Sequence, residues 1–166
     1  AEKLRALSYA ELFTEVYGPD ALSNPSTAFT NMADAIEAYE KTSEVSPFSS
    51  KYDRWLRGEM ELSKQELLGL KLFEDEDKGN CAACHPSKSA EEGSPPLFTD
   101  FTYDNLGTPR NPENPFYSLP PELNPDGFAF VDLGLGKTVN DPAQNGKFRV
   151  PTLRNVAITS PYMHNG

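Results

Sequence analysis

The sequence predicts a mainly α fold with long irregular loops. Apolar residues recur at helical spacing in the first quarter of the chain, and Ser-x-x-Glu motifs at Ser8 and Ser63 are typical of helix starts. Residues 86–148 are instead rich in Pro, Gly, Asn and Asp. With 15 prolines and 11 glycines among 166 residues, much of the chain must be irregular.

Two helices are predicted near the N-terminus. The first covers residues 2–17, with Ser8 as its cap and Glu11 reaching back, and it ends at Gly18. The second runs from about Ser26 to Thr42. Both should bury an apolar stripe, formed by Leu12, Phe13, Val16 and Tyr17 in the first helix and by Phe29, Met32, Ala33, Ile36 and Tyr39 in the second.

Further elements follow in the middle of the chain. A short helix is predicted at Ser50–Arg57, and a longer one starts at Ser63, whose partner in the capping box is Glu66. It continues to Phe73. The alternating residues 97–103 predict a short strand. The rest of residues 86–148 should wrap as ordered loop, and loops of this length are usually functional or held by a cofactor.

One pentapeptide carries the chemistry: Cys81-Ala82-Ala83-Cys84-His85. Two cysteines three apart, followed by histidine, are the signal for covalent haem c attachment, with the histidine as proximal iron ligand. A zinc site would lack ligands, because only His164 remains among Cys and His residues. A thioredoxin-like redox pair would require a surrounding βαβ pattern, and none is visible. A structural disulfide between the two cysteines would close almost no loop and would therefore stabilise the fold little.

The net charge and the hydropathy of the chain indicate which classes of partner and which cellular compartment to expect. The net charge of −10 argues against nucleic acid and fits a basic or neutral redox partner. No apolar run approaches the ~20 residues of a membrane span. Because haem c is attached outside the cytoplasm, we expect a periplasmic or otherwise extracytoplasmic protein. Its secretion signal would have been removed before Ala1, or the chain would be an internal piece of a longer precursor.

Three stretches together resemble the bacterial di-haem cytochrome c peroxidase and MauG family, in its C-terminal haem domain. They are residues 35–40 with Phe48 and residues 52–58, then residues 67–73 with the pentapeptide, and finally Phe148-Arg149-Val150-Pro151-Thr152-Leu153-Arg154-Asn155-Val156 continuing to Gly166. The resemblance covers residues 28–166 and implies a cytochrome c-like haem domain. Residues 1–27 would be the end of a preceding N-terminal haem domain or a linker.

The resemblance also implies that the domain is incomplete at its C-terminal end. The family's closing helix and distal haem ligand would lie beyond Gly166. The apolar face of residues 64–74 should therefore lack a cover.

The resemblance implies a set of site residues. Cys81 and Cys84 would anchor haem c, and His85 would bind its iron. Arg154 is a candidate to neutralise haem propionates, since Arg pairs well with carboxylates. The backbone carbonyls of Thr159 and Pro161 would contribute to a calcium site. No catalytic residue is assigned in this chain, because the second, peroxide-reactive haem would lie in a domain outside it.

We therefore expect a haem c electron-transfer domain that relays electrons to that second haem in a peroxidase-type oxidoreductase. Its partners would be the remaining parts of the same enzyme, a small redox protein as electron donor, and a second copy in a homodimer. One alternative is a MauG-like enzyme that oxidises a protein substrate. Another is a stand-alone mono-haem cytochrome, with Met60, Met163 or His164 as sixth ligand.

Overall fold

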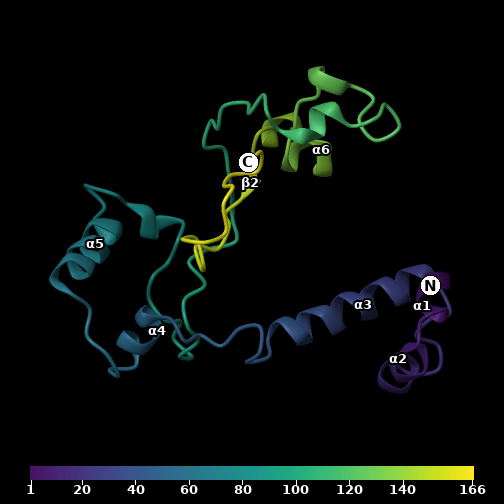
Figure 1. Ribbon diagram of the computed structural model, residues 1–166, viewed down its shortest axis with the longest axis horizontal. Helices are drawn as coiled ribbons and strands as arrows, with labels where there is room; N and C mark the ends of the chain where they lie inside the picture. The colour runs from purple at the N-terminus through teal and green to yellow at the C-terminus, as the bar shows by residue number, and fades with distance from the viewer. The chain divides into compact units, whose positions relative to one another are not determined.

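The computed structural model describes residues 1–166 and forms two compact units, Ala1–Met60 and Glu61–Gly166. Each unit is described by itself, and Figure 1 gives the element labels. The assignment of residues 1–27 to a preceding domain stays a prediction. No helix is both long and apolar enough to cross a bilayer.

The first unit holds four helices: α1 (Glu2–Arg5), α2 (Ala10–Tyr17), α3 (Pro25–Glu40) and α4 (Lys51–Leu56). Helix α3 starts where the sequence indicates, because the side chain of Asn24 accepts from the Thr27 backbone N–H and Pro25 occupies the first turn. Helix α4 starts with a full capping box between Ser50 and Asp53. The predicted helices at residues 26–42 and 50–57 are thus confirmed within two residues.

The first predicted helix is wrong at its centre. The chain turns between Arg5 and Ala10, and Tyr9 is the N-cap of α2 without any side-chain cap. Ser8 therefore lies one residue too early to cap the helix. Two backbone bonds of the turn, from Leu7 to the Leu4 carbonyl and from Ala10 to the Leu7 carbonyl, favour this arrangement over a continuous helix.

The core of the first unit is small. It consists of Phe13, Ala21, Leu22 and Ala28, and the ring of Phe13 lies 4.9 Å from that of Tyr17. The predicted buried stripes are wrong for most of their members, because nothing in this unit covers them. The exposed members are Leu12, Val16, Phe29, Ala33, Ile36 and Tyr39.

The second unit begins with α5 (Lys64–Glu74), which starts at the predicted capping box of Ser63 and Glu66. The 3-10 turn η1 (Cys81–Ala83) follows, and then mostly irregular chain. Its remaining elements are β1 (Tyr103–Asp104), η2 (Pro115–Ser118), η3 (Gly127–Ala129), α6 (Leu135–Val139), η4 (Pro142–Gln144) and β2 (Phe148–Arg149). Strands β1 and β2 pair antiparallel, with Tyr103 opposite Arg149. Residues 86–148 are mostly irregular, as predicted, but they also hold α6 and three 3-10 turns that the sequence did not indicate.

The predicted strand at residues 97–103 is wrong except at its last residue. Phe98 and Phe101 have positive φ angles of 53° and 62°, which turn the backbone out of an extended path. The Asp100 N–H donates to the Cys84 carbonyl over 3.0 Å. The segment therefore wraps against the Cys81–His85 turn instead of pairing along a strand.

Candidate functional site: the Cys81–His85 turn

A close backbone approach leads from α5 into the Cys81–His85 turn. The Gly79 N–H donates to the Leu72 carbonyl over 3.1 Å, and the next residue, Asn80, has a left-handed φ of 47°. The His85 N–H then bonds the Cys81 carbonyl over 2.9 Å. Both cysteines are free and half-buried. The turn therefore presents two thiols and one imidazole from five consecutive residues.

The ring of His85 is fixed by a backbone carbonyl. Its Nδ1 lies 2.7 Å from the Phe98 oxygen. Because a carbonyl only accepts, Nδ1 carries the proton in this bond, and the lone pair of the neutral ring is on Nε2. This tautomer, oriented by a carbonyl, is the form in which histidine binds a metal. The donor set of this turn therefore fits a covalently attached haem with Nε2 as its axial ligand.

The thiol of Cys84 lies in acidic surroundings. Its Sγ is 3.9 Å from the Asp104 carboxylate. Burial raises the pKa of the Cys84 thiol above its usual value, and the negative charges of Asp104 and Asp100 raise it further. The Cys84 thiol is therefore held in its protonated form at neutral pH.

The segment that carries the Phe98 carbonyl is bound by the tail of the chain. The buried hydroxyl of Thr99 donates to the Val150 carbonyl over 2.6 Å. The Nε of Arg154 donates to the Pro96 carbonyl over 2.9 Å, and its guanidinium lies 5.8 Å from the centre of the Phe98 ring. Arg154 thus lies beside the segment that orients His85, and its role toward a propionate stays a prediction.

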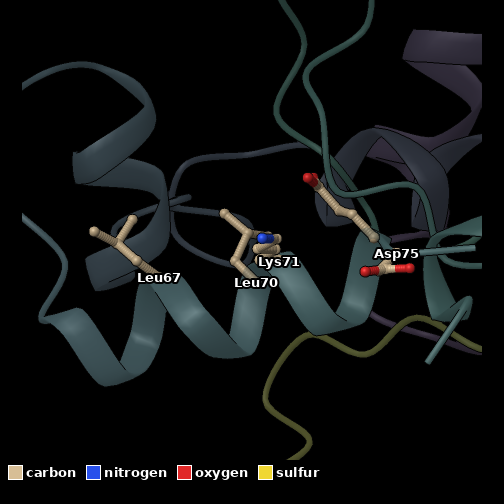
Figure 2. Close-up of a pocket in the computed structure, with 5 residues that line it drawn as sticks. Leu67, Leu70, Lys71 and Asp75 are labelled. Atoms are coloured by element: carbon tan, nitrogen blue, oxygen red, sulfur yellow. The ribbon is translucent and has the colours of Figure 1, made fainter. Parts of the chain in front are cut away.

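Helix α5 carries an open apolar groove of about 360 Å³. Figure 2 shows Leu67 and Leu70 on this face, with Lys71 and Asp75 beside them. The predicted exposure of this helix is observed, since Leu68 is 56% exposed.

The other predicted site residues lie at the end of the tail. Thr159 and Pro161 are exposed, and the Thr159 hydroxyl donates to the Asn155 carbonyl over 3.2 Å. No group of three or more His, Cys, Asp or Glu side chains is placed to hold a metal ion, which leaves a calcium site built from carbonyls untested. Among the three candidate sixth ligands, Met60 and Met163 are exposed, and the His164 ring stacks on Phe148 at 3.6 Å.

Sequence reasoning missed three features. The Phe98 carbonyl has no sequence signature, because any residue supplies a backbone oxygen. Asp104, twenty residues after Cys84, gave no local signal. A second cavity of about 490 Å³ lies beside Arg110 and His164. The Arg110 guanidinium lies over the rings of Tyr117 and Phe128, at 4.3 and 4.2 Å from their centres.

Comparisons with known proteins show what the chain as a whole resembles. The family model described as di-haem cytochrome c peroxidase matches residues 1–61. The chain is 40% identical to the methylamine utilization protein MauG of Paracoccus denitrificans, in an alignment that covers 96% of the chain. The cytochrome c551 peroxidase of Nitrosomonas europaea is 31% identical over 100% of it. The crystal structure of the diheme peroxidase BthA from Burkholderia thailandensis superposes with a TM-score of 0.72 over 99% of the chain at 34% identity.

The chain spans only part of each of these proteins. It covers 39% of that MauG, 41% of that peroxidase and 40% of the BthA chain.

Proposed function

The chain belongs to the di-haem cytochrome c peroxidase and MauG family, and on this premise we propose that residues 61–166 bind the electron-relay haem of a peroxidase-type oxidoreductase. Hydrogen peroxide would be the acceptor. The observation that carries the proposal is the contact of His85 Nδ1 with the Phe98 carbonyl inside a Cys-x-x-Cys-His turn. It leaves Nε2 as the free nitrogen of a neutral ring.

Each residue of the turn has its own part. Cys81 and Cys84 would form thioethers to the porphyrin, and His85 would bind the iron. The haem supplies reversible one-electron storage when it is bound. The Phe98 carbonyl keeps the imidazole in one tautomer and one orientation, so that the ligand does not reorganise when the charge at the iron changes.

The remaining parts of the proposal lie outside this turn. A second, peroxide-reactive haem would be held by another part of the complete protein, and a small redox protein would deliver electrons in the periplasm. Arg154 would pair with a haem propionate, and the carbonyls of Thr159 and Pro161 would bind calcium. These assignments rest on the resemblance of the tail, residues 148–166, to the family.

The test removes the two thioether anchors together. We expect the variant Cys81→Ser with Cys84→Ser, in the full-length protein, to contain one covalent haem fewer by the pyridine haemochrome assay. Peroxide-dependent oxidation of a reduced small cytochrome should fall to background, because electrons lose their entry point. A variant that lacks this haem and still turns over at the parental rate would contradict the relay role.

A MauG-type role is the second candidate, and one observation favours it: the identity of 40% to a MauG protein exceeds the 31% to the Nitrosomonas peroxidase. Here the complete protein would oxidise a protein substrate. A near-infrared and Soret spectrum separates the two, since a methionine axial ligand at this haem indicates the peroxidase type and a tyrosine indicates the MauG type. A count of one haem per complete protein would instead favour a stand-alone cytochrome.

A further inference from the structure

Three side-chain bonds hold the segment around Phe98 to the tail of the chain. Thr99 donates to the Val150 carbonyl, Thr152 donates to the Leu97 carbonyl over 2.5 Å, and Arg154 donates to the Pro96 carbonyl. We call these three bonds the tail clamp. They fix residues on both sides of Phe98, and the residues that they join are more than 50 positions apart in the sequence.

The clamp acts on a backbone that would not hold its shape alone. Phe98 has a φ of 53°, a left-handed conformation that is rare for a bulky residue and that persists only where the surroundings impose it. This conformation is the one in which the Phe98 oxygen lies 2.7 Å from His85 Nδ1. The ring of Phe98 is held as well, edge-on to Phe73 of α5 at 6.3 Å.

Two of the bonds are made to the backbone carbonyls of the two residues that precede Phe98. The carbonyls of Pro96 and Leu97 accept from Arg154 and Thr152. The hydroxyl of Thr99 has a second partner, because it also accepts from the Phe101 N–H over 3.0 Å. With Thr99 buried, its hydroxyl has little access to competing water.

We propose that Thr99 and Thr152 are positioning residues for the axial ligand, which set the strength of the bond between His85 Nδ1 and the Phe98 carbonyl. A strong bond on Nδ1–H makes the imidazole a better electron donor to the iron, and this lowers the reduction potential of the haem. The two threonines thereby tune the haem through His85. The inference rests on the proposed function, that is, on haem c at Cys81, Cys84 and His85.

The test uses the full-length holoprotein and the pair Thr99→Val and Thr99→Ser. Thr99→Val removes the hydroxyl at nearly constant shape, and Thr99→Ser restores it. In the first variant we expect the ¹H NMR signal of His85 Nδ1–H to move upfield, its exchange with solvent to become faster, and the midpoint potential of this haem to rise. Thr99→Ser should return all three toward the parental values.

A variant of a second threonine tests the inference even if the Thr99→Val protein does not fold. Thr152 is exposed, so Thr152→Val should accumulate as holoprotein even where Thr99→Val does not, and it should move the Nδ1 signal in the same direction. Ser118→Ala is the matched control. It removes a hydroxyl bond of 2.9 Å to the Pro115 carbonyl in η2, and we expect no change in signal or potential.

Two results would overturn the inference. A lower melting temperature with an unmoved Nδ1 signal and potential would reduce the clamp to a purely structural role. A shift seen in Arg154→Gln while both threonine variants are silent would assign the effect to a propionate partner. Absence of covalent haem in the parental protein would refute the proposed function itself, and the haemochrome assay reports that separately.

Discussion

Gly79 is the residue that lets α5 run into the Cys81–His85 turn, because a side chain does not fit there. A Cβ atom at this position would lie 2.5 Å from the backbone oxygen of Leu72, the atom that accepts from Gly79 N–H. We expect Gly79→Ala to destabilise the protein by about 1–3 kcal/mol, a common cost of an extra methyl group in a packed site. Urea unfolding of the holoprotein measures this, and the covalent haem yield should fall with it.

Gly69 provides the matched control in the preceding helix. Nothing lies within 4 Å of a Cβ built there. Gly69→Ala should stabilise α5 by about 0.5–1 kcal/mol, because alanine loses less backbone entropy on folding than glycine. Equal effects of the two substitutions would show that the approach of residue 79 to Leu72 is not tight.

At the scale of single residues, the sequence indicates the site through its side chains, but it gives no sign of contacts made by backbone atoms. Cys81, Cys84 and His85 are recognisable because covalent attachment needs those residue types at that spacing. The partner of His85 is not, because the carbonyl of Phe98 reaches it only through a positive φ. No propensity argument places a phenylalanine in that conformation.

At the scale of elements, the two Ser-x-x-Glu motifs allow a direct comparison. The hydroxyl of Ser63 accepts from the Glu66 N–H, and the Glu66 carboxylate accepts from the Ser63 N–H over 2.7 Å. We expect Ser63→Ala to destabilise the holoprotein by about 1 kcal/mol, the usual value of an N-cap. Ser8→Ala, which removes no cap in α2, should change the unfolding free energy little. Similar losses in both variants would contradict this difference.

The Ser63 motif forms a capping box and the Ser8 motif does not, and this difference shows which elements the sequence could predict. Ser63 is itself extended, with φ −64° and ψ 162°, and forms its capping box. The Ser8 motif instead falls inside a turn that is held by its own backbone hydrogen bonds. The alternation at residues 97–103 failed for a similar reason. A pattern of period two indicates a strand only if a partner strand is present, and here β2 pairs with Tyr103 and Asp104 alone.

At the scale of the whole chain, periodicity correctly predicted where α3 runs but not what it packs against. Phe29 and Ile36 are 67% and 50% exposed, although they occupy the apolar stripe. Burial depends on what the rest of the protein places over a face, and helical spacing carries no information about that. Leu68 on α5 is a further example, since it is an apolar helix residue and is 56% exposed.

The charge of the chain leads to a prediction for the complete protein. Ten excess negative charges create a field that attracts a basic electron donor and speeds its encounter. We expect the second-order rate constant with such a donor to fall about tenfold as salt shortens the Debye length from ~30 Å to ~8 Å. Stopped-flow mixing with a basic small cytochrome measures this, and a donor of near-zero net charge should show a much weaker dependence. A rate that rises with salt would assign the docking surface to a part of the protein with the opposite charge, because the field at the point of encounter, rather than the charge of this chain, steers the donor.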